Sequence, residues 1–220
     1  NGKTLSAPAN GAIAVNGTDF IPSGLLLEAG GIRVAIDPVV AGFGGLVDYI
    51  ILTHAHPDHF SPGDVRRLAG PQTTIVAPEA MRASLDLPCR FVGMKPGERF
   101  EEAGFAARAF KACNEKPVFL WIKAHPCDGS SLAFELEFSG FRVFHAGDSD
   151  ARTEFRDLHG ADLAVLPIGG ERLTMDAIEA ARLLEDMRPL VALPVHFEPA
   201  KDSLGTFLQK APGTCRVIVP

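Results

Sequence analysis

One short stretch constrains this chain more than any other. The residues THAHPDHF, at 53–60, overlap the end of the apolar run DYIILTH at 48–54. A continuous apolar run of this length, ending in polar residues, is typical of a buried β-strand. Three histidines and an aspartate then lie within the six positions 54–59. Left unpaired, such groups would be costly to crowd at the end of a buried strand, so the stretch predicts a binding site.

The spacing of these residues predicts metal ligation. Side chains two apart in an extended chain point the same way, so His54 and His56 can reach one metal ion. Pro57 fixes the turn that follows, after which Asp58 and His59 can face a neighbouring point. Paired ions about 3.5–4 Å apart are a known hydrolytic device. The alternative is a solvated loop whose histidines are satisfied by hydrogen bonds.

Short β-rich runs alternate with short helical runs along the chain. Ser61 is typical of a helix N-cap and Pro62 of the first helical position. We expect strands or hairpins at 24–37, 48–54, 73–78, 105–113, 131–148, 162–169, 190–197 and 215–220, and helices at 61–70, 79–86 and 174–188. The hairpins at 24–37 and 131–148 both close on an aspartate near a turn, which indicates a duplicated unit and two sheets packed face to face. Because no linker divides the chain, we expect one domain over residues 1–220.

Composition limits the class of partner. The 220 residues are 46% hydrophobic and 22% charged, which is enough apolar material for a sizeable core. A net charge of −6 argues against a protein that grips nucleic-acid backbone. No apolar run approaches the roughly 20 residues that span a bilayer. We therefore expect a small-molecule substrate, no nucleic-acid or membrane partner, and a possible homo-oligomer.

The cysteines bear on the compartment. Cys89, Cys113, Cys127 and Cys215 are widely spaced and form no C-x-x-C pair. This pattern favours buried free thiols over disulfides, and hence a reducing, cytoplasmic location. The chain begins at Asn1 and not at Met, which leaves open the removal of an upstream targeting segment.

The histidine stretch matches the H-x-H-x-D-H motif of the metallo-β-lactamase superfamily. The segments GGIRVAIDP, GFRVFHAGDSD and VALPVHF follow in the order found in its small single-domain metal-dependent hydrolases. The chain resembles their ascorbate-phosphate lactonase-like branch. This resemblance implies an α+β fold: a four-layer αββα sandwich of two mixed β-sheets with helices on the outer faces.

The same resemblance implies a ligand set. His54 and His56 correspond to ligands of a first metal ion, and Asp58, His59 and His196 to ligands of a second. Asp148, in HAGDSD, matches the aspartate that bridges both ions. Asp58 and Asp148 are the residues expected to take part in catalysis. His145 lies on the predicted hairpin strand, where a structural role is expected.

A third ligand of the first metal is harder to place. Where many relatives carry a histidine, this chain has Lys111 or Asn114. A subset of relatives reads roughly AYN…KPFHPKG, which is closer to ACNEKPVFLWIKAHPCDG at 112–129, with a longer insertion here. His125 is then the candidate, because it is the only histidine between positions 59 and 145. Cys127 is expected to be a bystander, and Lys111 either points away or binds an anionic substrate group.

Two further residues carry expectations. Asp37, directly before Pro38, is expected to cap its strand and to support a ligand histidine. Trp121 lies in the insertion KPVFLWIKAHP, which is unusually apolar for a loop. It is expected either to wall the substrate pocket or to pack on another subunit.

These observations predict a metal-dependent hydrolase. Imidazole and carboxylate ligands suit zinc, with manganese or iron as alternatives. Two such ions lower the pKa of a shared water and supply hydroxide at neutral pH for attack on a small-molecule ester, lactone or phosphodiester. The first alternative is a nuclease of the same superfamily, which the acidic balance opposes. The second is a metal-binding but catalytically inactive regulatory protein, supported only by the altered third-ligand region.

Overall fold

The computed structural model describes residues 4–6, 12–15, 18–85, 87–102 and 104–220. Within these residues the strands form a two-stranded hairpin, a five-stranded sheet in the order β3-β4-β5-β6-β7, and a seven-stranded sheet in the order β14-β13-β12-β11-β10-β9-β8. Both larger sheets are mixed. The β3–β4 pair is antiparallel and β4 to β7 are parallel, whereas β8 to β11 are antiparallel and β11 to β14 are parallel.

The strands of the hairpin and of the five-stranded sheet are β1 Ile13–Val15, β2 Thr18–Phe20, β3 Leu25–Ala29, β4 Ile32–Ile36, β5 Tyr49–Ile51, β6 Thr74–Pro78 and β7 Arg90–Met94. Those of the seven-stranded sheet are β8 Arg99–Glu102, β9 Phe105–Lys111, β10 Leu132–Phe138, β11 Phe141–His145, β12 Leu163–Pro167, β13 Val191–Val195 and β14 Arg216–Val217. The helices are α1 Pro62–Leu68, the 3₁₀ helix η1 Glu79–Ser84, α2 Thr153–Arg156, α3 Ala177–Met187 and α4 Ser203–Lys210.

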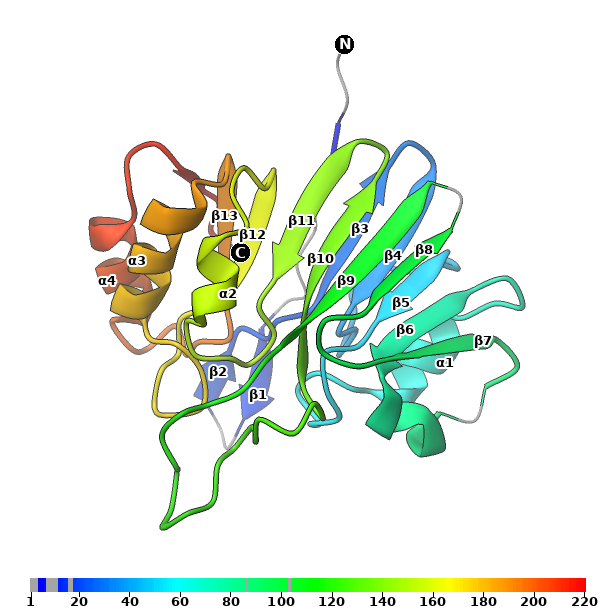
Figure 1. Ribbon diagram of the computed structural model, residues 1–220, viewed down its shortest axis with the longest axis horizontal. Helices are drawn as coiled ribbons and strands as arrows, with labels where there is room; N and C mark the ends of the chain where they lie inside the picture. The colour runs from blue at the N-terminus through cyan, green and yellow to red at the C-terminus, as the bar shows by residue number, and fades with distance from the viewer. Residues whose placement is uncertain (1–3, 7–11, 16–17, 86, 103) are drawn as a thin grey trace.

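Three apolar clusters hold these elements in layers (Figure 1). The central cluster joins Leu27 and Ile51 of one sheet to Phe134 and Val165 of the other. A second cluster packs α2, α3 and α4 on the outer face of the seven-stranded sheet, and a third packs α1 and η1 on the five-stranded sheet. Each fully buried large apolar side chain contributes about 1.5–3 kcal/mol. The predicted four-layer αββα sandwich is therefore confirmed.

Most predicted elements are present. Both hairpins and the buried strands form, and Ser61 caps α1 by accepting a hydrogen bond from the Asp64 amide at 3.2 Å. The segment expected as a helix at 79–86 forms a 3₁₀ helix instead. The elements β1, β2, β7, β8, α2 and α4 were not predicted. Most of these are short, and β8 (RFEE) is a charged edge strand without a clear apolar period.

The site residues follow the carboxyl ends of the parallel strands. Asp37 follows β4, His54 follows β5, Asp148 follows β11 and His196 follows β13. Carboxyl ends of parallel strands share one edge of a sheet, and here the corresponding edges of both sheets meet. Gly147, just before Asp148, has φ +57°, and a Cβ there would lie 2.9 Å from the Leu132 carbonyl oxygen. This close approach of two backbones requires glycine.

The expectation of four free thiols is wrong for one pair. Cys113 and Cys127 form a disulfide with a Cα–Cα distance of 5.0 Å, whereas Cys89 and Cys215 are free. The segment between β9 and β10 folds back on itself and brings together two cysteines that are 14 residues apart. Sequence spacing alone did not reveal this approach. The thiol-based argument for a reducing compartment consequently fails for this pair.

We expect the Cys113–Cys127 bond to stabilise the fold. Closing a loop of about 15 residues removes conformational freedom from the unfolded chain worth about 3 kcal/mol. The variant Cys113→Ser/Cys127→Ser should lower the free energy of unfolding by about that amount, measured by urea denaturation. Cys89→Ser is the matched control, because Cys89 is free. Equal stability of the double variant and the wild type would contradict this expectation.

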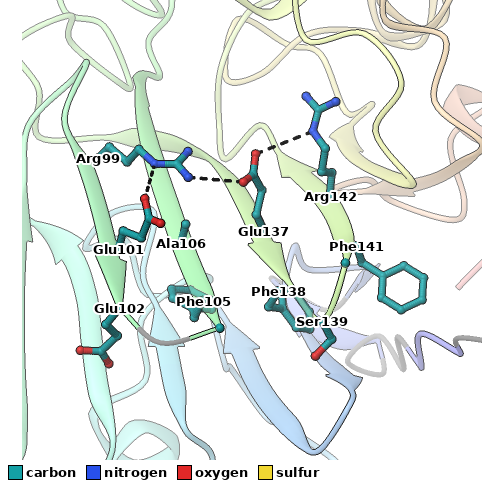
Figure 2. Close-up of a pocket in the computed structure, with 12 residues that line it drawn as sticks. Arg99, Glu101, Glu102, Phe105, Ala106, Glu137, Phe138, Ser139, Phe141 and Arg142 are labelled. Atoms are coloured by element: carbon teal, nitrogen blue, oxygen red, sulfur yellow. Dashed lines mark hydrogen bonds and ion pairs between the residues drawn. The ribbon is translucent and has the colours of Figure 1, made fainter.

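A charged ladder crosses the open part of the seven-stranded sheet (Figure 2). It lines a groove of about 630 Å³ at the end of the sheets formed by the β8–β9 and β10–β11 turns. Arg99 pairs with Glu101 at 3.1 Å and with Glu137 at 3.4 Å, and Glu137 also pairs with Arg142 at 3.9 Å. The ladder keeps this face polar where no helix covers it. In the described part of the chain, no helix is long and apolar enough to cross a membrane.

Candidate metal centre

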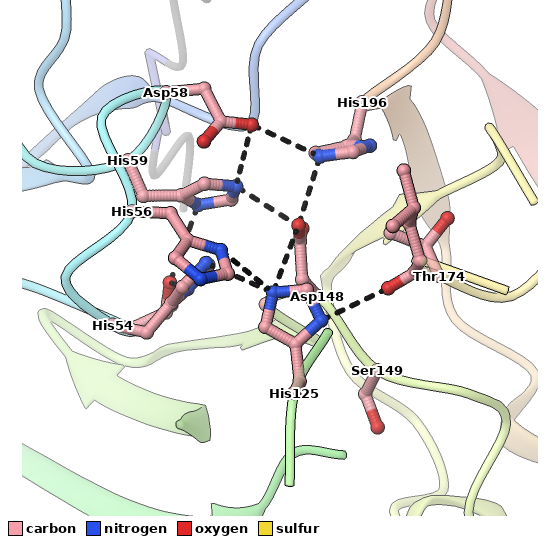
Figure 3. A network of polar contacts seen from close by, with 12 residues as sticks. His54, His56, Asp58, His59, His125, Asp148, Ser149, Thr174 and His196 are labelled. Atoms are coloured by element: carbon pink, nitrogen blue, oxygen red, sulfur yellow. Dashed lines mark hydrogen bonds and ion pairs between the residues drawn. The ribbon is translucent and has the colours of Figure 1, made fainter. Parts of the chain in front are cut away.

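The structure brings all seven predicted ligands together in two groups (Figure 3). The first group is His54, His56 and His125, and the second is Asp58, His59, Asp148 and His196. Within each group the candidate ligand atoms lie within 4.8 Å of one another. The residues come from the loops after β5, β11 and β13 and from the β9–β10 connection. Their role as metal ligands stays a prediction.

The first group places three ring nitrogens around one point. His125 Nε2 lies 3.2 Å from His54 Nε2 and 3.1 Å from His56 Nδ1. Ligands of a tetrahedral zinc ion with bonds of about 2.0–2.1 Å lie about 3.3 Å apart. The observed spacing is close to this value. His54 and His125 are buried, whereas His56 is exposed, so the group is open to solvent on one side.

The contacts of His125 fix which nitrogen carries the proton. Its Nδ1 faces two acceptors, Asn114 Oδ1 at 2.8 Å and the Leu173 carbonyl oxygen at 3.1 Å. The amide of Asn114 is itself oriented, because its Nδ2 donates to Asp150 Oδ1 and to the Leu173 carbonyl oxygen. Neutral imidazole carries one proton, so Nδ1–H donates and the lone pair of Nε2 points at the other two histidines. This is the tautomer that a metal ligand requires.

Asp37 orients the ring of one histidine in each group, directly for His59 and through Thr53 for His54. Its Oδ2 accepts from His59 Nδ1 at 2.8 Å and from the Thr53 hydroxyl at 2.6 Å. Because that hydroxyl donates to Asp37, its oxygen accepts from His54 Nδ1, 3.0 Å away. When the rings are neutral, the Nε2 atoms of His54 and His59 are thereby left as acceptors. Asp37 is fully buried, and the expectation that it supports a ligand histidine agrees with these contacts.

The second group holds two carboxylates against two imidazoles. His59 Nε2 lies 3.2 Å from Asp148 Oδ1, and His196 Nε2 lies 2.9 Å from Asp148 Oδ2 and 3.3 Å from Asp58 Oδ2. Both His59 Nε2 and Asp148 Oδ1 are buried and have no hydrogen-bond partner among the described residues. Orphaned buried polar atoms are costly. A cation between them would satisfy both, so the residues present fit a metal ion.

Asp148 lies between the two groups. Its Oδ2, besides contacting His196, is 3.6 Å from His125 Nε2 of the first group. It is the carboxylate for which the structure shows contacts to both groups. This position fits the predicted bridging role.

The two groups have opposite electrostatic character. In the first, burial lowers the pKa of His54 well below its usual value and that of His125 to about 4. In the second, burial also disfavours the imidazolium forms, but the negative charge of Asp148 and the hydrogen bonds of His196 to Asp148 and of His59 to Asp37 outweigh it. They raise the pKa of His196 to about 9 and that of His59 well above its usual range. At neutral pH the metal-free His54 and His125 are neutral, whereas His59 and His196 hold protons.

We therefore expect the two groups to differ in the pH dependence of metal binding. A cation entering the second group displaces the proton of His196, so its affinity should rise as the pH rises from 6.5 towards about 9. Binding at the first group should release no proton from His125 at pH 7, because the pKa of that residue is about 4. Calorimetric zinc titrations at pH 7, in buffers of different ionisation enthalpy, measure the protons released. Equal proton release at both steps would contradict this assignment.

The structure leaves the remaining candidates outside both groups. Lys111 is the last residue of β9, opposite Leu132 of β10, and Cys127 is held in the disulfide. His145 is buried and donates from Nε2 to the Ser23 carbonyl oxygen at 3.0 Å, which is a structural contact. Sequence reasoning missed Thr53 as a supporting residue and considered Asn114 only as a possible ligand. Their positions beside His54 and at the start of the 114–125 segment were the available signals.

Comparisons with known proteins agree with this geometry. A family model described as a β-lactamase superfamily domain matches residues 35–197. A UPF0173 metal-dependent hydrolase from Aeropyrum pernix is 32% identical over 194 residues, covering 78% of this chain and 77% of that protein. One from Thermus thermophilus is 31% identical over 208 residues, covering 86% and 88%.

A solved structure shows the same fold. A metallo hydrolase from Ignicoccus hospitalis superposes with a TM-score of 0.75 at 22% identity, covering 99% of this chain and 95% of that one. The family match spans the segments from β4 to the residue after His196, and so contains every residue of both groups. The chain belongs to the β-lactamase superfamily domain family and is a metal-dependent hydrolase of the metallo-β-lactamase superfamily.

Proposed function

We propose that this protein hydrolyses a small-molecule ester, lactone or phosphodiester with two divalent metal ions, zinc being the favoured metal. The observation that carries the proposal is the pair of adjoining residue groups, with Asp148 of the second group 3.6 Å from His125 of the first. When bound, such ions activate water and stabilise negative charge on the reacting carbonyl or phosphoryl oxygen. The first ion would be held by His54, His56 and His125, and the second by Asp58, His59, Asp148 and His196.

A cavity beside the second group supports a small-molecule substrate. Its volume is about 510 Å³, within the range of ligand pockets. It is lined by Ile13, Thr18, Phe20, Pro57, Asp58, Leu173, His196 and Glu198. The wall is largely apolar, and Phe20 packs edge-on against the His196 ring with centroids 4.8 Å apart. An apolar group of the substrate would occupy this space while its reacting bond faced the ligand groups.

The two carboxylates proposed as catalytic have different surroundings. Asp148 is fully buried and its pKa is held well below the usual range, because His196 and His59 outweigh the effect of burial. It therefore stays ionised and fixes both groups. Asp58 is partly exposed, with 31% of its side chain accessible, and it lines the cavity. It is the carboxylate placed to accept a hydrogen bond or a proton from substrate.

The alternative functions have less support. The residues that line the cavity include no lysine or arginine, so its wall offers no cationic contact to a nucleic-acid backbone. An inactive regulatory protein was supported by the altered third-ligand region alone. His125 lies with the other two histidines, which removes that support.

The proposal is tested by metal content and turnover together. Protein reconstituted separately with zinc and manganese should bind about two ions per chain, as a dinuclear site requires. It should hydrolyse at least one substrate class in a panel of esters, lactones and phosphodiesters. Chelator should abolish turnover, and added metal should restore it. A stoichiometry near zero after reconstitution, or no turnover on the panel by fully loaded protein, would refute the proposal.

A further inference from the structure

An apolar hairpin projects from the connection between β9 and β10. In Figure 1 this green segment extends beyond the ends of both sheets. At its tip the exposed fractions are 66% for Phe119, 64% for Leu120, 81% for Trp121 and 54% for Ile122. Four consecutive large apolar residues at such exposure are unusual on a folded protein and mark an interaction site. The tip is defined here as residues 118–122.

The tip is held in one shape. The Ile122 amide donates to the Phe119 carbonyl oxygen at 2.8 Å, and the Val118 amide donates to the Ile122 carbonyl oxygen at 2.8 Å. At the base, the Asn114 amide donates to the His125 carbonyl oxygen at 3.0 Å, and the Cys113–Cys127 disulfide closes the loop. Because the turn is hydrogen-bonded and the disulfide closes its stem, the backbone of the tip is already ordered before any partner binds.

The tip does not wall the substrate cavity. None of its five residues is among those that line the 510 Å³ cavity. Of the two roles expected for Trp121, the structure therefore gives no support to the wall. The apolar side chains of the tip are exposed to solvent and available to a partner.

Cations surround the tip. Lys116 and Lys123 flank it in sequence, and neither has an ion-pair partner among the described residues. Arg172 reaches the base of the hairpin and donates to the Pro117 carbonyl oxygen at 3.1 Å. The nearby acid Glu115 is paired with Arg152 at 3.6 Å. Lys116 and Arg172 also line a hollow that contains five acidic residues, Glu115, Asp150, Glu171, Asp176 and Glu179. The positive charge next to the apolar residues therefore comes from the two lysines that flank them, Lys116 and Lys123.

We propose that residues 118–122 insert into the interface of an anionic lipid membrane. An apolar tip with an exposed tryptophan, flanked by lysines, matches the depth profile of a bilayer: aromatic and aliphatic groups below the headgroups, cations at the phosphates. Such a contact needs no membrane-spanning segment. It differs from the expectation of no membrane partner, which rested on the lack of a long apolar run.

A second copy of the chain fits the tip less well. A stable dimer interface buries about 800 Å² on each partner. A hairpin tip of five residues is a small protrusion and not a broad surface of that kind. A symmetric contact between two tips would also bring both sets of Lys116, Lys123 and Arg172 together. Like charges held close together oppose association. An anionic lipid surface can accept a protruding apolar tip, and its negative charge attracts the flanking cations.

Trp121 makes the proposal directly measurable, because it is the only tryptophan in the chain. Protein with its metals bound is mixed with phosphatidylcholine vesicles that contain or lack phosphatidylglycerol. We expect co-sedimentation with the anionic vesicles and a blue shift of tryptophan emission, both weakened by salt. Phe119→Ser/Trp121→Ser should weaken co-sedimentation about ten-fold or more. Lys116→Glu/Lys123→Glu should weaken it about 25-fold or more, at about five-fold for each lysine.

Matched controls lie elsewhere on the surface. Leu190→Ser removes an apolar side chain of similar exposure, 65%, and Arg66→Glu/Lys210→Glu reverses two exposed cations on α1 and α4. These variants should bind vesicles as the wild type does. The proposal is overturned if the wild type binds neither vesicle. It is equally overturned if the blue shift depends on protein concentration, not on lipid, and accompanies dimer formation that Phe119→Ser/Trp121→Ser abolishes.

Discussion

Asp148→Ala is expected to lower turnover about 10²–10³-fold while most of the bound metal remains. Asp148 contacts residues of both groups: His59 at 3.2 Å, His196 at 2.9 Å and His125 at 3.6 Å. Each group retains its histidines in the variant, so each still offers ligands to an ion. Without the Asp148 carboxylate, the position of one group relative to the other is no longer fixed. Hydrolysis depends on that relative position, whereas metal retention depends on the number of ligands left.

The measurement pairs kinetics with metal analysis on the same preparation. The ratio of turnover to bound metal should fall sharply in Asp148→Ala. Asp157→Ala is the matched control, since Asp157 is exposed and lies outside both groups. Thermal unfolding of the metal-loaded variants shows whether the fold is intact. A folded Asp148→Ala protein with unchanged turnover would rule out the bridging role.

His125→Ala is expected to weaken binding of the first ion by at least about 100-fold, whereas Lys111→Ala should leave it unchanged. Without His125, His54 and His56 would hold an ion by two protein ligands, and hydrolytic zinc sites commonly have three plus water. The nitrogen His125 contributes is already oriented by Asn114 and the Leu173 carbonyl oxygen. Lys111 is the last residue of β9, and its ammonium would repel a cation.

Competition with a coloured chelator resolves the two binding steps. The histidine variant should lose the step that releases no proton from His125 at pH 7 and keep the pH-dependent one. The lysine variant should retain both ions, and any loss of turnover in it would indicate contact with an anionic substrate group. If His125→Ala binds both ions with normal affinity, the third ligand has been misassigned and the first site is incomplete in this protein.

Much of the site could be read from local sequence, for a physical reason. The cluster at 54–59 is specified by spacing after one buried strand, and strand geometry decides which side chains point together. Asp148 and His196 each follow an apolar strand, so a shared sheet edge could be anticipated. His125 was placed by resemblance and by being the only histidine in its stretch. Its approach to His54 depends on the fold of a long connection, which no periodic pattern describes.

Other features required contacts between distant segments. The support of His54 by Asp37 passes through Thr53, and the tautomer of His125 depends on Asn114 and Asp150. Hydrogen bonds of this kind are set by positions within a few tenths of an ångström, which spacing along the chain does not fix. The Cys113–Cys127 disulfide was missed for the same reason. So was the cavity beside Phe20, because its wall is assembled from β2 and loops far apart in sequence.

The sequence by itself determined the alternation of buried strands and helices, the two hairpins, and the residue types gathered at the strand ends. Apolar period and turn chemistry are local properties, and they suffice for these features. Only the tertiary structure decided which nitrogen of each histidine faces the centre, and that Asp148 lies between the two groups. It also decided that the apolar insertion projects outward and that its tip does not line the cavity. These outcomes depend on how separate segments of the chain pack against one another, and packing is a property of the whole chain.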